Sequence, residues 1–171
     1  TDHLVFLGST LNQPVNGTIE AHLLYNEVTD HNVYTNNTIT NSTIYEALRM
    51  APNAPGPHRF IVLTDNVLVP HMEFRFTNAP WNTSQYNENI LIERNNLVGL
   101  NICNVNRKVV VRNNVFAGNQ VFLSYPLEFR QDDNGVPTTL HSEDIYIYNN
   151  TVTNAVGGVW WASNHISDRR Y

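Results

Sequence analysis

The stretch Ile92-Glu93-Arg94-Asn95-Asn96-Leu97 decides the fold, because its pattern recurs along the chain. An apolar residue is followed by two variable residues, an Asn, one variable residue and a second apolar residue. The same pattern stands at 111–116, 147–152 and 63–68, and more loosely at 34–39. A short repeat that ends a strand in Asn is typical of one coil of a solenoid, so the sequence predicts stacked coils.

The recurring Asn, which we call the anchor, sets the length of the coils. The anchors are Asn37, Asn66, Asn95, Asn114 and Asn150. Their spacings are 29, 29, 19 and 36 residues. Because 36 is twice 18, we expect a further rung at Leu127–Asp132, with Asp132 in the anchor place. The prediction is about five to seven coils of 18 or 19 residues, with insertions of about ten residues in the first half.

Three columns of residues, counted from the anchor, are predicted to face inward. They lie five and three residues before the anchor and two residues after it, and most members are large and apolar. Alternation with period two before the anchor indicates a strand. A buried anchor amide needs hydrogen-bond partners, which a ladder of stacked Asn side chains would supply.

Short strands, bends at Asn or Gly and a repeat near 18 residues resemble the right-handed parallel β-helix of the pectate-lyase-like superfamily. The resemblance covers about residues 28–162 and implies an all-β solenoid, with residues 1–171 forming one domain. A β-sandwich stays open as the alternative, because hairpin-type Asn-Gly pairs stand at Asn16-Gly17 and Asn134-Gly135. One insertion departs from the repeat: Thr43–Met50 is predicted as a short helix, ended by the prolines that follow.

The composition of the chain argues against some classes of partner and favours one cellular compartment. The net charge of −5 argues against a nucleic-acid partner, and no stretch is long and apolar enough to span a membrane. Cys103 is the single cysteine, so an intrachain disulfide and a cysteine-rich metal site are excluded. Without an initial Met or signal peptide, the chain is expected to be a fragment of a longer protein, or processed from one. Glycosylation sequons at five positions favour an extracellular or cell-surface glycoprotein: Asn16, Asn36, Asn41, Asn82 and Asn149.

The outward columns carry the functional predictions. Glu93 and Arg112 occupy the same place in adjacent coils and are expected to form a cross-strand ion pair, with Arg130 as a like-charged neighbour of Arg112. The interpretation is either a solvated charged face or a site for a carboxylated or sulfated sugar. The substrate-binding candidates are Glu93, Arg94, Trp160 and Trp161, the last two because an exposed indole stacks on sugar faces.

The resemblance implies a catalytic alternative. In polysaccharide lyases of this superfamily an Arg or Lys abstracts the proton next to a uronate carboxylate, and another cation or Ca²⁺ neutralises that carboxylate. The resemblance therefore gives four catalytic candidates: Lys108, Arg112, Arg130 and Tyr148. No cofactor or metal motif accompanies them, so Ca²⁺ is possible without being indicated. The scattered histidines are interpreted as structural.

A second outward column suggests a different class of function. Four residues before the anchor the column is mostly apolar: Val33, Val62, Leu91, Val110, Glu128 and Tyr146. An apolar stripe is not normally left in water, so an insertion or a partner should cover it. Self-association through this stripe would make the chain a non-catalytic structural or adhesive β-helix, such as a filament, shaft or tailspike-like protein. Polysaccharide engagement is the other hypothesis.

Overall fold

The structure, a computed structural model, describes residues 3–12, 24–26, 30–40, 47–50, 58–69, 72–74, 86–103, 105–117, 127–130, 142–154, 160–162 and 169–170. Every regular element in these residues is a β-strand. The helix predicted at Thr43–Met50 is therefore wrong over its second half, because Leu48–Met50 forms strand β6. Residues 43–46 lie outside the described part. Leu48 and Met50 are fully buried, so packing in the core outweighs the helix propensity of this segment.

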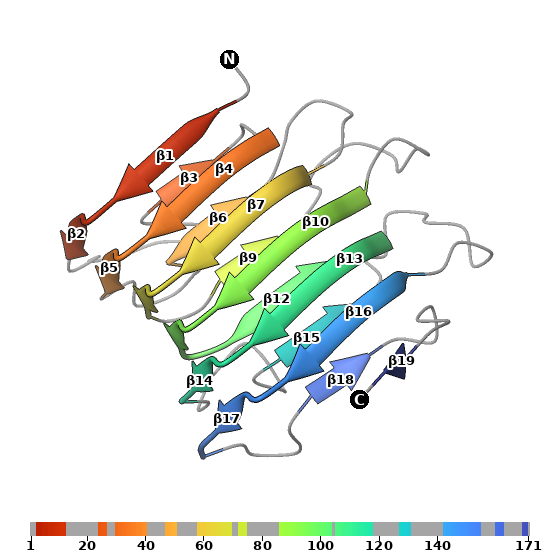
Figure 1. Cartoon of the computed structure of the whole chain (residues 1–171). Coiled ribbons are helices and arrows are strands. Elements are labelled where there is room, and N and C mark those ends of the chain that lie inside the picture. Colours follow the sequence, from red (N-terminus) through yellow and green to blue (C-terminus); the bar gives the residue numbers. More distant parts are fainter. Residues whose placement is uncertain are drawn as a thin grey trace, which may run out of the picture.

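The strands form three sheets, in which every pair is parallel. Sheet A contains β1 (Leu4–Leu7), β4 (Asp30–Thr35), β7 (His58–Thr64), β10 (Tyr86–Glu93), β13 (Val105–Arg112), β16 (Glu143–Tyr148) and β19 (Arg169–Arg170). Sheet B contains β2 (Thr10–Asn12), β5 (Thr38–Thr40), β8 (Val67–Leu68), β11 (Asn96–Leu97), β14 (Val115–Phe116) and β17 (Thr151–Val152). Sheet C contains β3 (Leu24–Asn26), β6, β9 (Met72–Phe74), β12 (Leu100–Cys103), β15 (Leu127–Arg130) and β18 (Trp160–Ala162). The described strands visit sheets A, B and C in turn along the chain (Figure 1).

The register within sheet A confirms the alignment on the anchors and corrects it at two places. Glu93 pairs with Arg112, as predicted. The rung predicted at Leu127–Asp132 is wrong, because Leu127–Arg130 is β15 of sheet C and β16 follows β13 directly in sheet A. The interval of 36 residues is thus one long coil. At the other end, Leu4–Leu7 was expected to be a strand without a clear anchor, and it forms β1 of a further rung. Ser9 occupies the anchor place there and donates its N–H to Asn37 Oδ1 at 3.0 Å.

The core lies between the three sheets, and the predicted inward columns supply much of it, together with side chains of sheet C. Its buried apolar members are Tyr34, Ile39, Ala47, Leu48, Met50, Ile61, Leu63, Leu68, Ile90, Ile92, Leu97, Leu100, Ile102, Val109, Val111, Phe116, Leu127 and Ile145. Full burial of such a side chain contributes roughly 1.5–3 kcal/mol.

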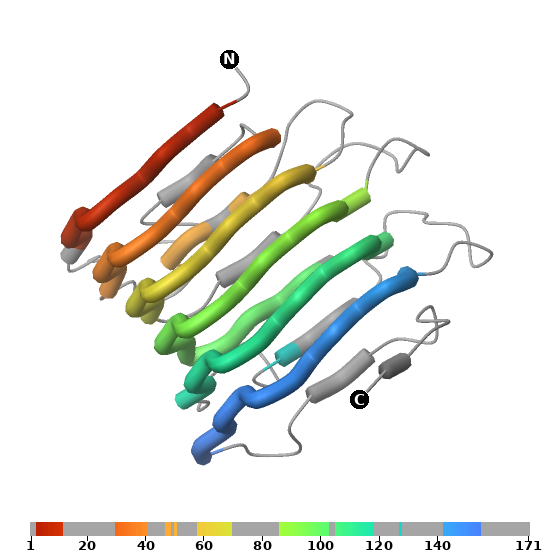
Figure 2. Tube along the Cα trace, in the orientation of Figure 1, coloured from red at the N-terminus to blue at the C-terminus, as the bar shows by residue number. Residues whose placement is uncertain are grey.

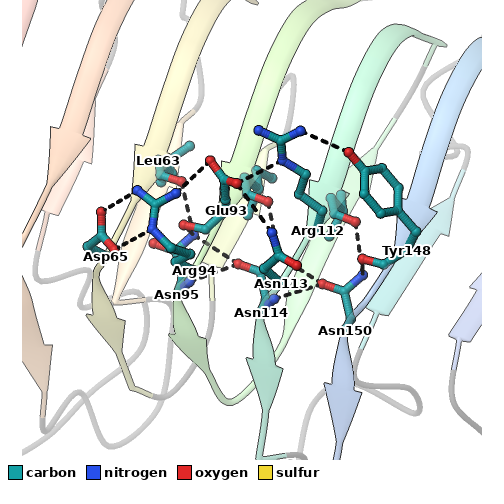
Figure 3. Close-up of polar contacts among 12 residues, drawn as sticks. Leu63, Asp65, Glu93, Arg94, Asn95, Arg112, Asn113, Asn114, Tyr148 and Asn150 are labelled. Atoms are coloured by element: carbon teal, nitrogen blue, oxygen red, sulfur yellow. Dashed lines mark hydrogen bonds and ion pairs between the residues drawn. The ribbon is translucent and has the colours of Figure 1, made fainter.

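The predicted Asn ladder is confirmed. Asn95 Oδ1 accepts from the backbone N–H and from the side-chain amide of Asn66, each at 2.9 Å. The Asn95 amide in turn donates to Asn114 Oδ1 and to the backbone oxygen of Leu63 (Figure 3). The same pattern repeats from Asn37 through the other anchors to Asn150, so each buried amide is held by two neighbouring coils.

Two columns of left-handed backbone shape each strand of sheet A. The residues directly before the anchors have φ between 53° and 58°: Asn36, Asp65, Arg94, Asn113 and Asn149. The residues six before the anchors have φ between 51° and 56°: His31, Phe60, Asn89, Lys108 and Asp144. Non-Gly residues seldom adopt this region, and bulky ones such as Phe60 least of all. The first column makes the sharp bend that lies in the same place in successive coils (Figure 2).

A second buried polar column lies eight residues before the anchors. Its members are His58, Asn87, Asn106 and Ser142. The first three are neighbours in sheet A, and Ser142 stands directly before β16 and contacts Asn106. Asn87 donates its amide to Asn106 Oδ1 at 2.7 Å, and the Asn106 N–H donates to Ser142 Oγ at 2.9 Å. Complete burial lowers the pKa of His58 to about 3. His58 is therefore neutral at physiological pH and part of the interior.

Candidate functional site

A connected set of polar side chains lies on the outer face of sheet A, at its bend into sheet B. We call it the outer network: Asp65, Glu93, Arg94, Arg112, Asn113 and Tyr148 (Figure 3). Glu93, Arg112 and Tyr148 stand two residues before their anchors and are adjacent in register on β10, β13 and β16. The other three stand directly before their anchors, where left-handed backbone turns the chain.

Glu93 is the centre of the network. Its Oε1 accepts from Arg112 Nε at 2.8 Å and from the Asn113 amide at 3.3 Å, and its Oε2 lies 2.8 Å from Arg94 Nη1. The predicted Glu93–Arg112 ion pair is thereby confirmed. The hydrogen bond from Arg112 is the main cause that lowers the pKa of Glu93, helped by the charges of Arg112 and Arg94 and opposed by burial. The carboxylate is therefore held ionised, and both of its oxygens are engaged.

Arg94 joins a second carboxylate to this centre. Its Nε and Nη2 each lie 2.8 Å from one oxygen of Asp65, in a two-pronged pair. The bond to Asp65 is the main cause that raises the pKa of Arg94, and the bond from Arg94 is the main cause that lowers the pKa of Asp65. Each of the three nitrogens of Arg94 is thus engaged within the network, and only the second N–H of Nη1 and of Nη2 is left for a ligand.

Arg112 is the member best placed to meet a ligand. Its Nη1 donates to the Tyr148 hydroxyl at 2.9 Å, and this bond is the main cause that raises its pKa. The predicted contact of Arg112 with Arg130 is wrong, because Arg130 lies in sheet C and pairs in register with Cys103. Of the contacts among the described residues, none uses Nη2 of Arg112, whose side chain is 36% exposed (Figure 3).

Lys108 belongs to the same strand as Arg112 but not to the outer network. It stands on the second left-handed column, is 59% exposed and lies 3.4 Å from Glu88 Oε1. Lys108 stands four positions before Arg112 along β13, and this step places their backbones about 13 Å apart in a strand. Val110 lies between them, half-buried, with half-buried Leu91 and Tyr146 beside it in register.

The remaining predicted residues are placed as follows. Trp160 and Trp161 lie in β18 of sheet C, apart from the sheet that holds Tyr148. The sequons Asn36 and Asn149 are exposed at bends, whereas Asn16, Asn41 and Asn82 lie outside the described residues. In the apolar outer column, the five members in sheet A are half-buried, and exposed Val5 continues the column at the first rung: Val33, Val62, Leu91, Val110 and Tyr146. The prediction of Glu128 in this column is wrong, because Glu128 lies in β15 of sheet C and pairs with Asn101.

Two members of the outer network were missed in the sequence. Asp65 and Asn113 stand directly before anchors, a column that includes the predicted residue Arg94. Left-handed backbone in that column turns these side chains out of the core while the anchor turns inward. The available signal was the frequency of Asn and Asp there, since both residues tolerate this conformation better than most.

In the part of the chain that the structure describes, no group of three or more His, Cys, Asp or Glu side chains is arranged to hold a metal ion. No described helix has the length and apolar character that crossing a membrane requires. Comparison of the chain with protein-family models, with curated proteins and with solved structures found no match. The chemistry of the outer network therefore has to be argued from its own geometry.

Proposed function

We propose that this chain is an extracellular right-handed parallel β-helix that binds an acidic polysaccharide through the outer face of sheet A. The strand order supports the fold, because six passes through sheets A, B and C precede the return to A at β19. The extracellular compartment is supported by the sequons at the exposed bend residues Asn36 and Asn149. A rigid stack of coils presents its outer side chains at fixed spacing, as an extended polymer requires.

The arrangement of Arg112 carries the proposal. Glu93 holds its Nε and Tyr148 its Nη1, so the guanidinium is fixed while Nη2 is left to donate outward. A donor that is already fixed loses less conformational entropy when a ligand binds. Guanidinium groups match the geometry of carboxylate and sulfate oxygens, which are the acceptors an acidic polysaccharide offers.

The surroundings of Arg112 also favour such a ligand. The oxygens of Glu93 and Asp65 are all bonded inside the network, so they offer few acceptors to a ligand. Lys108 adds a second exposed cation about 13 Å away along β13. Between the two cations, Val110 and its neighbour Tyr146 provide a partly apolar floor against which the apolar face of a sugar can pack.

The geometry supports binding more than proton abstraction. A general base works best when its pKa lies near the working pH. The bonds to Tyr148 and Glu93 instead raise the pKa of Arg112, which moves it away from that range. Arg130, the other guanidinium candidate for catalysis, lies in a different sheet.

Affinity electrophoresis tests the proposal in gels that contain alginate, pectate or a neutral glucan. Alginate or pectate should retard the chain and the neutral glucan should not, and Arg112→Gln should weaken binding about tenfold. Arg59→Gln is the matched control, because Arg59 is an equally exposed, ion-paired arginine of sheet A outside the network. Equal retardation by the glucan, or unchanged binding by Arg112→Gln, would contradict the site. Absorbance from an unsaturated product, lost in Arg112→Gln, would point to a lyase instead.

A further inference from the structure

An aromatic stack lies on the outer face of sheet A, along the second left-handed column. His3 stands directly before β1, and His31 and Phe60 follow in the same place on β4 and β7. The ring centres of His3 and His31 lie 4.7 Å apart with planes inclined by 24°, and those of His31 and Phe60 lie 4.5 Å apart with planes inclined by 19°. The rings are therefore nearly parallel and repeat at the spacing of the strands.

Phe60 is the last ring of this stack in the direction of β10. His31 covers one face of the Phe60 ring. The Arg59 guanidinium, 6.0 Å from the ring centre, is bonded to Asp30 of β4 and so is drawn toward β4 as well. The other face of the ring is turned toward β10, where the column continues with Asn89, whose side chain is shorter than a ring. Phe60 is 43% exposed.

The backbone at Phe60 is strained. Its φ of 54° is costly for a bulky side chain, whereas Asn adopts this region more readily. Asn89, in the same place of the next strand, has φ of 56°. Phe60 thus combines a strained backbone with a ring that is partly left in water. Strain of this kind is typically kept at ligand-binding sites, where the surrounding structure holds it in place.

On the far side of Asn89 the column continues with Lys108 of β13 (Figure 1). Two strand spacings, about 9.6 Å, separate the places of Phe60 and Lys108. A ring in van der Waals contact needs about 4 Å on each side, so one ring fits above Asn89 between them. Lys108 is 59% exposed, and its Nζ lies 3.4 Å from Glu88 Oε1. An ammonium has three donors, so Lys108 can also bind a ligand carboxylate.

We propose that the space above Asn89 binds one uronic acid ring of the polysaccharide, stacked on Phe60 with its carboxylate paired to Lys108. The ligand ring would continue the aromatic stack at the same spacing, with its C–H face against the Phe60 ring. A uronic acid fits because a single ring supplies both the C–H face and the carboxylate. This subsite rests on the proposed function, and it adds a second point of contact to the one at Arg112.

NMR titration with an oligogalacturonate, together with affinity electrophoresis in pectate gels, tests the subsite. Protons on the stacked face of the sugar should shift upfield with the wild type, because they would lie over an aromatic ring. Phe60→Leu keeps an apolar side chain without the ring, and it should abolish this shift and weaken binding about fivefold. Phe60→Tyr keeps the ring and should restore both. Val115→Ala is the matched control, because Val115 is an equally exposed apolar residue of sheet B, 41% exposed, and it should alter neither readout.

A blocking variant tests the position of the subsite. Asn89→Phe places the protein's own ring in the space, and it should abolish the upfield shift and weaken binding as much as Phe60→Leu does. Phe60 shows that the left-handed column admits this side chain. Circular dichroism and urea denaturation check that each variant keeps the fold.

Arg112→Gln, measured in parallel, separates this proposal from the proposed function. If Arg112→Gln weakens binding while Phe60→Leu and Asn89→Phe do not, polysaccharide binding at Arg112 stands and the subsite is wrong. If only the variants at Phe60 and Asn89 weaken binding, the subsite stands and the site at Arg112 is wrong. A wild type that gives no upfield shift, or an equal shift with a neutral oligoglucan, would also overturn the subsite.

Discussion

The Asn ladder on the inner side of the bends and the outer network on their outer side are built partly from neighbouring residues of the same bend, yet the two sets of side chains lie in different environments. Asn95 is 2% exposed and bonded to the coils on both sides. Arg94, the residue before it, has a side chain that is 51% exposed and makes ion pairs in reach of water. The left-handed bend at Arg94 separates the two environments within a single residue. The inner side of the bend therefore holds the buried contacts that stabilise the fold, and the outer side holds the charged groups that the proposed ligand would meet.

Replacement of Asn95 by Ala should have the largest effect. The change leaves the backbone N–H of Asn66 without an acceptor, and it removes one of the two hydrogen bonds of the Asn66 amide and of the Asn114 side-chain oxygen. An unsatisfied buried group costs about 1–3 kcal/mol and a lost hydrogen bond about 1 kcal/mol, so the free energy of unfolding should fall by about 3–5 kcal/mol in urea denaturation. Asn96→Ala, one residue further on and exposed, should change it by no more than about 0.5 kcal/mol. Similar losses from the two variants would refute the ladder's role.

The apolar core and the Asn ladder could be predicted because the same residue types recur at the same places along the chain. Large apolar residues recur in three columns, and the amide of Asn suits a buried ladder, so the sequence alone indicates both. The rung at Ser9 escaped notice because Ser is shorter and lacks the amide, and the column of His58 because it mixes three residue types. Nothing in residue type alone marks His58 as the neighbour of Asn87.

The contacts of the outer network could be predicted only where the strand register alone brings two residues together. Glu93 and Arg112 are adjacent because 19 residues separate them, one coil apart. Arg130 was misplaced because the interval of 36 residues divides evenly into two coils, although the chain uses it as a single coil with long connections. The lengths of insertions carry no periodic signal, so the partner of Arg112 on that side, Tyr148, emerges only from the strand pairing.

The buried column that contains His58 should make the stability of the inner side depend on pH. Burial lowers the folded-state pKa of His58 from 6.5 to about 3, so between these values the unfolded chain binds a proton that the folded chain does not. Stability should therefore fall as the pH falls through this window, by at most about 1.4 kcal/mol per pH unit. His58→Asn, which matches Asn87 and Asn106 in its column, should show a flatter pH profile of urea midpoints from pH 7 to 4. An unchanged profile would show that other groups govern acid stability.

The smallest effect is expected at the outer edge of the network. Asp65→Asn removes a carboxylate whose pKa is lowered by its bond to Arg94. Taken alone, this lowered pKa means that the ionised carboxylate stabilises the fold above pH 3.8 and that the stabilisation is lost as the pH falls. The Asp65 side chain is 44% exposed, however, and water and salt screen such a pair. The urea midpoint at pH 7 should thus be unchanged within error, at both low and high salt. A clear loss of stability at low salt would mean that the network holds the bends together. No loss would mean that the ion pair of Asp65 with Arg94 contributes little to the stability of the fold.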